Sequence, residues 1–551
     1  MALPTALLHL LDPAAYAHPA ASVRLIETHI SWVLIAGEYA YKIKKPLDLG
    51  FLDFSTLAKR RFCCDEEIRL NRRLAPDIYL DVVAVTDAGF TGAGETREWA
   101  VRMRAFPADA TLDREAEVTT EQIDAIAERV ARFHGEIAVA SSDYGSAEAV
   151  MHPVRENLRQ IFAFISPPSD KATKQPTKQA KNACQVSAYP QPLPPQGGGA
   201  TLPSPLGGEG LGERGVTDQA RLGHLETWSE QEHLRLLDHF DARKASAFIR
   251  ECHGDLHLGN IAWVDHAPLI FDCIEFNPGL RFIDVISEVA FLCMDLIARG
   301  LEPLAWRFLN RYLEHTGDYA GLAGLRFYLV YRALVRAKVA GIRASQGDAG
   351  SRAEMQRYLD LAERLTQTGR PALLLMHGFS GSGKSRLSQR LLQDLGAVRL
   401  RSDVERKRLF NLHALADSRA AGDIYTAEAG QRTFARLREL AGALLDLGFP
   451  VIVDATFLKL DHRAEFIALA ETKALPWRIV SLQVDADTLR RRVARRQARA
   501  DDASEADLAV LESQIGHAEP LAAGELAHLT VHSGDDDATS SELGRFIAQA
   551  G

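Results

Sequence analysis

The sequence has few cysteines and no long apolar segment. Six cysteines occur among 551 residues, and no CxxC pair is present, so a scaffold stapled by disulfides is disfavoured and a reducing cytoplasm is expected. No apolar run approaches the ~20 residues that a membrane-spanning helix needs. The first 21 residues contain no Lys or Arg before their apolar stretch, which His9, Asp12 and Pro13 interrupt. We therefore expect a soluble amphipathic helix there rather than a secretion signal.

An excess of basic charge is also lacking. Lys and Arg number 64 against 73 Asp and Glu, which gives a net charge of −9. This balance disfavours a general nucleic-acid coat and a polybasic membrane binder. The hydrophobic share of 46% and the charged share of 25% are typical of a soluble globular protein. At ~100–200 residues per domain, the length predicts more than one domain.

One segment differs in composition from the rest of the chain. Residues 167–217 contain nine of the 23 prolines and almost no apolar periodicity. Such a segment cannot bury enough apolar surface to offset the entropy cost of ordering, so we expect a disordered insertion. The insertion interrupts a helical region of a first domain, which is predicted to span residues 1–366. A second domain is predicted for residues 370–551.

The two predicted domains differ in their pattern of elements. Residues 22–110 are rich in strand-like alternation around one charged helix, whereas residues 120–165 and 222–366 are mainly helical in periodicity. The last third alternates short apolar strands with helices, which is the pattern of a parallel α/β sheet. We therefore predict an α+β first domain and an α/β second domain, whose parallel sheet is flanked by helices.

The strongest functional signal is a glycine-rich loop. The segment GFSGSGKS matches G-x-x-x-x-G-K-[ST] in full, and a chain of this length should contain only ~0.02 such matches by chance. The apolar run ALLLMH ends directly before it and a helix-like segment follows, an arrangement that aims backbone N–H groups at phosphates. Lys384 is predicted to reach the β- and γ-phosphates of ATP, and the Ser385 hydroxyl to bind Mg²⁺. The predicted nucleotide-binding residues are Gly378, Phe379, Ser380, Gly381, Ser382, Gly383, Lys384 and Ser385.

Further charged residues fit the same site. Asp454 ends the apolar run PVIVD, where an acidic residue would bind Mg²⁺. Asp403 follows the run VRLRS, and at the carboxyl edge of a parallel sheet it could accept a proton from a substrate hydroxyl. Arg492 and Arg496 share one helix face, which favours an anionic partner and charge neutralisation during phosphoryl transfer. A solvated basic face is the alternative interpretation of these arginines.

These residues carry a resemblance to a known group of enzymes. The segments GFSGSGKS, RSDVERKR, VIVDATF and RRRVARRQARADDASEAD, over residues 370–535, resemble the P-loop kinase group that includes gluconate-kinase-like, polynucleotide-kinase-like and zeta-toxin-like ATPases. The resemblance implies that Asp403 is the general base and that the arginine-rich helix is a lid.

A second constellation lies in the predicted first domain. In HGDLHLGN, Asn260 follows Asp255 by five residues, which is the spacing of a kinase catalytic loop. Asp272 ends the apolar run APLIF twelve residues later. Phosphoryl transfer needs a carboxylate that orients the acceptor hydroxyl and oxygen ligands for the metal. We therefore predict that Asp255 is catalytic and that Asn260 and Asp272 bind Mg²⁺, while His253 braces the loop.

The same segments resemble the aminoglycoside phosphotransferase family, a branch of the protein-kinase-like fold. HGDLHLGN, IFDCIEF and Asp284 in RFIDVISEVAF carry the resemblance, which runs over about residues 25–345 without the insertion. It implies a bilobal domain with an interlobe hinge at MRAFP. The chain departs from the kinase pattern because no G-x-G-x-x-G segment is present to cover the phosphates.

The resemblance also implies an ATP-binding lysine on a strand, paired with a glutamate on a helix. Lys42 in AYKIKKP fits the lysine, with Lys44 as its rival on the same strand face. Glu67 in EEIRLNRRL fits the glutamate, with Glu66 as the near alternative.

Together these patterns predict a cytoplasmic phosphotransferase with two ATP sites, each transferring the γ-phosphoryl of Mg-ATP to a hydroxyl of a small molecule. An alternative is that the first domain is a nucleotide-binding pseudoenzyme that regulates the second. A further alternative is a second domain that phosphorylates polynucleotide ends. Nucleic acid is not favoured as a partner, and no membrane partner is expected.

Overall fold

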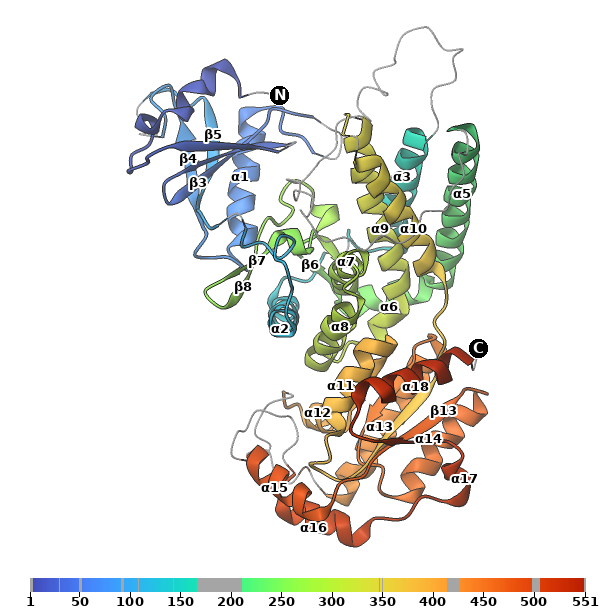
Figure 1. The fold of residues 1–551 in the computed structure, drawn as a ribbon. Helices are drawn as coiled ribbons and strands as arrows, with labels where there is room; N and C mark the ends of the chain where they lie inside the picture. Colours follow the sequence, from blue (N-terminus) through green and yellow to red (C-terminus); the bar gives the residue numbers. More distant parts are fainter. Residues whose placement is uncertain are drawn as a thin grey trace. The chain divides into compact units, whose positions relative to one another are not determined.

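The chain forms two compact units (Figure 1). The computed structural model describes residues 3–165, 211–413, 424, 426–497 and 506–549, except for residues 29, 49–51, 91–93, 108, 142, 346 and 349. The N-terminal unit contains residues 1–125, 132–298 and 324–366, and the C-terminal unit contains residues 126–131, 299–323 and 367–551. The domain limits of 1–366 and 370–551 stay predictions.

Residues 167–210, which make up most of the predicted disordered insertion, lie outside the described residues. Helix α5 begins at Leu211, so the last seven positions of the predicted segment are helical in the structure.

A five-stranded antiparallel sheet of order β1-β2-β3-β5-β4 forms the first part of the N-terminal unit (Figure 1). Its strands are β1 (Val23–Glu27), β2 (Ser31–Ala36), β3 (Tyr39–Lys44), β4 (Tyr79–Val85) and β5 (Glu98–Arg104). Helix α1 (Leu57–Asn71) packs against β4 and β5. Its N-terminus is capped by Thr56, whose side chain accepts a hydrogen bond from the N–H of Lys59.

The alternation of side chains along β3 places its lysines on one face. Tyr41 and Ile43 pack with Trp32 and Leu34 in the core on the other face of the sheet. Because successive residues of a strand point to opposite faces, Lys42 and Lys44 lie on the same face and both point toward α1.

The N-terminal segment adds to the core that contains Tyr41. Residues Thr5–Leu11 form a 3₁₀ helix in which Leu7 and Leu10 are buried, and a second short turn spans Pro13–Ala15. The segment is therefore helical and amphipathic as expected, but it forms the tighter 3₁₀ helix rather than an α-helix.

The rest of the chain up to residue 366 is mainly helical, with two small antiparallel sheets, β6–β9 and β7–β8. The helices are α2 (Thr120–Glu136), α3 (Ala147–Ile165), α5 (Leu211–Arg235), α6 (Leu237–Ala245), α7 (Val285–Ala298), α8 (Glu302–Thr316), α9 (Leu322–Ser345) and α10 (Ser351–Thr366). The strands are β6 (Ile249–Glu251), β7 (Ile261–Val264), β8 (Ala267–Ile270) and β9 (Phe282–Asp284). Nearly every residue of α7 is buried, so this helix forms the centre of the helical part.

A parallel five-stranded sheet of order β11-β12-β10-β13-β14 forms the centre of the C-terminal unit. Its strands are β10 (Leu373–His377), β11 (Val398–Arg401), β12 (Val451–Asp454), β13 (Trp477–Leu482) and β14 (Leu529–His532). The helices after residue 380 are α11 (Lys384–Leu395), α12 (Ser402–Leu409), α13 (Ala427–Asp446), α14 (Leu460–Thr472), α15 (Ala486–Gln497), α16 (Leu508–His517), α17 (Ala523–Leu526) and α18 (Asp536–Gln549). The predicted α+β composition of the first part and the predicted parallel α/β sheet of the second are confirmed.

Helix α8 belongs to the C-terminal unit although it precedes residue 366 in the chain. It packs along α11 and against the edge strand β11. Among the described helices, none combines the length and the apolar character that crossing a bilayer requires.

Candidate active sites

The glycine-rich loop connects the central strand β10 to the first turn of α11. Gly378, Gly381 and Gly383 have φ values of 145°, 83° and 103°, a backbone region that other residues rarely adopt. A Cβ at Gly378 would lie 2.9 Å from the carbonyl oxygen of Leu482. The helix begins at Lys384, so its unpaired N–H groups and its positive end face the loop, as anion binding requires.

Two cations contact carbonyl groups of this loop. The Lys384 ammonium donates to the carbonyl oxygens of Gly378 and Phe379, each at 2.8 Å. From α15, Arg492 donates to the carbonyl oxygens of Gly381 and Ser382 at 3.4 and 3.3 Å. Phosphate oxygens can replace these neutral acceptors, because a charged acceptor gives the stronger hydrogen bond.

The arginine helix is only partly described. Arg496 lies in α15, but its side chain is outside the described residues. Arg490 pairs with Glu512 at 2.7 Å and with Asp487 at 3.0 Å, so this arginine is directed to carboxylates of its own unit.

Oxygen ligands for a cation meet beside the loop. Asp454 ends β12, which pairs in parallel with β10, and its carboxylate accepts a hydrogen bond from Ser388 at 3.1 Å. Asp454 and Ser385 line the same cavity. A carboxylate and a hydroxyl are hard oxygen donors of the kind that Mg²⁺ prefers, so these two residues fit the predicted role.

This cavity has a volume of about 800 Å³ and brings the predicted residues of the C-terminal unit together. Lys384, Ser385, Asp403, Asp454 and Arg492 all line it. Asp403 lies in the first turn of α12, directly after β11, and its carboxylate is 3.6 Å from the guanidinium of a neighbouring arginine, Arg406. The assigned roles of these residues stay predictions.

Several cations of the same cavity were missed at the sequence level. Arg401, Arg406 and Lys459 line it, together with His462, whose ring stacks on Phe434 at 3.8 Å. Burial, with the charge of Lys459, lowers the pKa of His462, so this ring is neutral near pH 7. The signal for these cations is their position, because each follows the carboxyl end of β11 or β12, where open α/β sheets bind ligands.

The catalytic-loop motif of the N-terminal unit forms a closed turn after β6. Asn260 donates from its side-chain amide to the carbonyl oxygen and to the carboxylate of Asp255, at 3.0 and 2.9 Å. The ring of His253 contacts the carbonyl oxygen of Phe271 at 2.9 Å. The predicted catalytic carboxylate and metal-binding amide are therefore adjacent, and His253 braces the loop as expected.

The interval of twelve residues between Asn260 and Asp272 is a β-hairpin. Strands β7 and β8 pair from Ile261 to Ile270, and the N–H of Phe271 donates to the carbonyl oxygen of Asn260 at 3.0 Å. The hairpin thus brings Phe271, the residue before Asp272, back beside Asn260. Asp272 follows with a φ of 64°, an uncommon conformation for a residue other than glycine and a feature that clusters at functional sites.

Both candidate lysines of β3 contact Glu67 of α1. The Lys42 ammonium lies 2.9 Å from Glu67 and 2.6 Å from Asp272. The Lys44 ammonium lies 2.6 Å from the other Glu67 oxygen and also pairs with Glu275. Only Lys42 reaches Asp272, the predicted metal ligand, and its side chain is 12% exposed, whereas that of Lys44 is fully buried. The structure therefore favours Lys42 as the phosphate-binding lysine.

The charges of this group depend on one another. Burial alone would raise the pKa of the Glu67 carboxyl, but Lys42 and Lys44 lower it below its ordinary value. Burial alone would lower the pKa of Lys42, but the charges of Asp272 and Glu67 raise it. Glu67 and the two lysines are therefore charged near pH 7 because of their oppositely charged neighbours.

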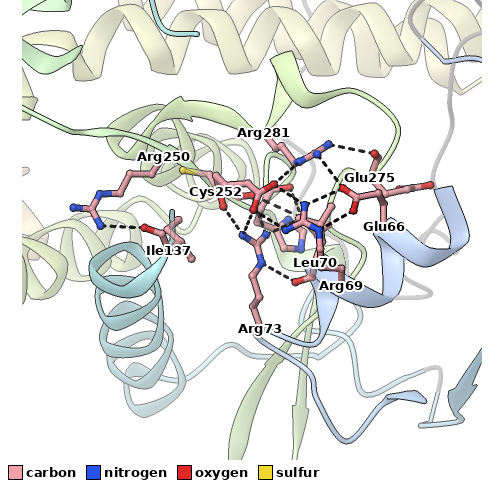
Figure 2. A network of polar contacts seen from close by, with 12 residues as sticks. Glu66, Arg69, Leu70, Arg73, Ile137, Arg250, Cys252, Glu275 and Arg281 are labelled. Atoms are coloured by element: carbon pink, nitrogen blue, oxygen red, sulfur yellow. Dashed lines mark hydrogen bonds and ion pairs between the residues drawn. The ribbon is translucent and has the colours of Figure 1, made fainter. Parts of the chain in front are cut away.

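The alternative glutamate, Glu66, has a different role. It pairs with Arg69 at 2.7 Å and with Arg281 at 3.2 Å, in a network that Figure 2 shows. In the same network Arg69 binds Glu251 at 2.7 Å, and Arg73 donates to the backbone of Glu251 at 2.6 Å. These contacts attach α1 to the segment that enters the catalytic loop, and so fix the position of Glu67.

A buried cluster behind the catalytic loop contains His134, Cys252 and Glu288, whose ligand atoms lie within 4.8 Å of one another. Glu288 accepts from His134 at 3.0 Å and from the N–H of Gly254 at 2.7 Å. Burial raises the pKa of the Cys252 thiol well above its usual value. Through its contacts with His134 and the N–H of Gly254, Glu288 braces the loop.

Comparisons with known proteins agree with this geometry. A family model described as an AAA domain matches residues 373–521. The uncharacterized proteins Rv2004c of Mycobacterium tuberculosis strain H37Rv and Mb2027c of Mycobacterium bovis are each 30% identical over 461 residues, which cover 81% of this chain and 81% of theirs.

Similar solved structures include a gluconokinase from Sinorhizobium meliloti, with 18% identity and a TM-score of 0.25 over 33% of this chain and 94% of that chain. The APS kinase CysC of Mycobacterium tuberculosis has 20% identity and a TM-score of 0.25 over 33% and 99%. A choline/ethanolamine kinase family protein from Mesorhizobium loti has 13% identity and a TM-score of 0.35 over 66% and 93%.

The predicted P-loop fold of the C-terminal unit is confirmed. The phosphate loop at the end of the central strand, the oxygen pair beside it and the AAA domain match identify the C-terminal unit as a P-loop nucleotide-binding domain. By its identity with the mycobacterial proteins over most of both chains, the chain belongs to the family of Rv2004c and Mb2027c.

Proposed function

We propose that the chain has two ATP sites, and that each transfers the γ-phosphoryl of Mg-ATP to a hydroxyl of a small-molecule acceptor. One observation carries this proposal. In the N-terminal unit, Lys42 pairs with Asp272 and Asn260 donates to Asp255. In the C-terminal unit, Lys384, Ser385, Asp454 and Asp403 line one cavity. We place the reaction in the reducing cytoplasm, because all five cysteines among the described residues are free and buried.

In the N-terminal unit, Lys42 would bind the phosphates, and Asn260 and Asp272 would bind Mg²⁺. The ion would neutralise phosphate charge when it is bound. Asp255 would accept the proton of the acceptor hydroxyl, whose oxygen forms the new bond to the γ-phosphorus. The bond from that phosphorus to the bridging β–γ oxygen then breaks, and ADP leaves.

In the C-terminal unit, Lys384 and the loop N–H groups would bind the phosphates, and Ser385 and Asp454 would bind Mg²⁺. Asp403 would take the acceptor proton, and Arg492 would exchange its two loop carbonyls for the oxygens of the transferred group. The bonds formed and broken are the same as in the first site.

The acceptor of the C-terminal site would carry negative charge. On the acceptor side of the cavity, the side chains after β11 and β12 include Arg401, Arg406 and Lys459, against the two carboxylates Asp403 and Asp454. The excess of cations over carboxylates in the cavity lining would attract an acceptor carboxylate, phosphate or sulfate.

A polynucleotide acceptor is less well supported. Strand binding needs cations directed outward along a surface, whereas Arg490 binds Glu512 and Asp487, and Arg492 faces the phosphate loop.

The test is a screen with labelled ATP on the wild type, Lys384→Ala and Asp272→Ala. The acceptors are matched charged and neutral pairs, such as gluconate with glucose and glycerate with glycerol, together with aminoglycosides and 5′-hydroxyl oligonucleotides. We expect one activity lost in each variant, and the Lys384-dependent activity confined to the anionic member of a pair. Turnover of every acceptor that is unchanged in both variants would overturn the proposal.

A further inference from the structure

Helix α8 supplies the contact that completes the exposed edge of the parallel sheet. Strand β11 lies at that edge, and the Asn310 side chain of α8 bonds to its backbone. The N–H of Arg399 donates to the Asn310 amide oxygen at 2.7 Å, and the Asn310 amide nitrogen donates to the carbonyl oxygen of Ala397 at 2.9 Å. A side-chain amide has the same donor and acceptor as a peptide group, so Asn310 takes the place of a neighbouring strand.

The side chain of Arg399 continues this contact toward the phosphate loop. Arg399 is 4% exposed, and two of its nitrogens donate to Glu314 of α8 at 3.1 and 2.5 Å. Its remaining terminal nitrogen donates to the carbonyl oxygen of Ser385 at 3.2 Å and to the hydroxyl of Ser388 at 3.1 Å. One buried guanidinium thus joins α8 to the first turn of α11.

The chain of contacts ends at the carboxylate beside the loop. The Ser388 hydroxyl donates to Asp454 at 3.1 Å, and Ser388 is fully buried. Glu314 therefore connects through Arg399 to both residues that the proposed function assigns to Mg²⁺, Ser385 through its backbone and Asp454 through Ser388.

Resting on that proposed function, we propose that Glu314 and Arg399 are positioning residues for the metal ligands of the C-terminal site, and that α8 is a part of that site. Hydrogen bonds to metal ligands from residues that do not touch the metal themselves fix the orientation of the ligands and tune metal affinity in proteins.

The charge of Glu314 has a second effect. A second guanidinium, that of Arg401, lies 3.7 Å from Glu314 and 4.0 Å from Asp454. Burial alone would raise the pKa of Glu314, but Arg399 and Arg401 lower it to about 2, so the carboxylate is charged. Without that charge, both arginines would be attracted to Asp454 and would compete with the metal for its oxygens.

Arg408 offers a matched control in the same unit. It donates to the carbonyl oxygens of Leu313 and Glu314 at 3.3 and 2.7 Å, so it attaches the same end of α8. Its other partner is Glu405. A loss of Arg408 loosens the helix without removing a hydrogen bond to Ser388 or Ser385.

The experiment compares full-length Glu314→Gln, Arg399→Gln and Arg408→Gln with the wild type. The first measurement is the Mg²⁺ concentration that gives half of the maximal rate of Lys384-dependent ATP turnover. The second is hydrogen exchange of the segments 384–389 and 451–456 without nucleotide. We expect an approximately tenfold higher Mg²⁺ requirement and faster exchange in both segments for Glu314→Gln and Arg399→Gln. For Arg408→Gln we expect less than a twofold change in either.

The proposal is overturned if Arg408→Gln raises the Mg²⁺ requirement as much as Arg399→Gln does, since the role of α8 is then only structural. It is also overturned if neither Glu314→Gln nor Arg399→Gln changes the requirement or the exchange. If Arg399→Gln does not fold, Ser388→Ala removes the last hydrogen bond without leaving a buried charge, and should raise the requirement about threefold. If the wild type shows no turnover, the proposed function fails, and the exchange measurement alone decides on positioning.

Discussion

The two candidate sites assemble the same chemistry by different means. In the C-terminal unit, one loop of eight consecutive residues provides the lysine, the hydroxyl and the backbone N–H groups, and its lysine rests on carbonyls of the same loop. In the N-terminal unit, the lysine, the glutamate, the catalytic loop and the metal carboxylate come from four separate segments, joined by buried ion pairs. The first design depends on local backbone geometry, and the second on charges that stabilise one another.

The largest effect is expected at the catalytic carboxylate of the N-terminal unit. Asp255→Asn removes the group that accepts the acceptor proton, so the rate of the Lys42-dependent reaction should fall by about 10²–10⁴-fold. The Lys384-dependent rate should not change. The control is Asp265→Asn, an exposed residue in the β7–β8 turn with a φ of 50° that asparagine tolerates. Equal rates for Asp255→Asn and wild type would show that this unit is not catalytic.

The second effect tests the dependence on buried charges. Glu67→Gln leaves Lys42 and Lys44 without their shared partner, so the free energy of local unfolding of β3 and α1 should fall by about 3–5 kcal/mol. Hydrogen exchange of these segments measures it. Glu66→Gln, at the partly exposed neighbour, should cost less than half as much. The same loss in both variants would contradict the assignment of Glu67.

A third effect is a loss of stability in acid. Burial would raise the pKa of Glu288, but His134, His253 and the N–H of Gly254 lower it to about 2 from an ordinary value of 4.5. A lowered carboxyl pKa stabilises the folded state above about pH 4.5, and this contribution is lost as the pH falls toward 2. At 1.36 kcal/mol per pKa unit, about 3 kcal/mol is at stake.

Acid unfolding followed by hydrogen exchange of residues 252–260 tests this expectation. Glu288→Gln should flatten the decline between pH 4.5 and 2, whereas Glu136→Gln, at an exposed position, should leave it unchanged. A decline of wild-type slope in Glu288→Gln would show that another group titrates.

The smallest effect is expected at the phosphate loop. Lys384→Ala removes charged hydrogen bonds worth about 1.5–3 kcal/mol, so ATP affinity of the C-terminal site should fall by about 10–100-fold. Calorimetric titration with a non-hydrolysable ATP analogue measures it. Lys473→Ala, which breaks only an ion pair with Asp446, should bind as the wild type does. Because the loop geometry is local, thermal stability should be similar in both variants.

The two sites also differ in how much of them the sequence predicts, because one is built from a contiguous loop and the other from separate segments. The phosphate loop is contiguous, so its eight residues could be assigned directly. Asn260 and Asp272 could also be proposed from their spacing, because a hairpin of fixed length separates them. The choice between Lys42 and Lys44 could not be made from alternation, since both point to the same face. It required their partners, Asp272 and Glu275, which lie about 230 positions away.

The contacts of α8 with the parallel sheet could not be predicted from the sequence. Arg399 and Glu314 are 85 positions apart, and periodicity places α8 in the first predicted domain. Nothing in the local pattern of a helix states which sheet it covers. Likewise, the fold class followed from strand and helix alternation, whereas the 3₁₀ geometry of Thr5–Leu11 did not, because the tightening depends on the packing of Leu7 and Leu10.

The contact between the Asn310 amide and strand β11 has a consequence for proteolytic fragments of the protein. By occupying the free backbone groups of Ala397 and Arg399, it prevents strand addition from another molecule at β11. A proteolytic fragment that starts near residue 370 would lack this cover and would present an open row of donors and acceptors. Such a fragment is expected to self-associate.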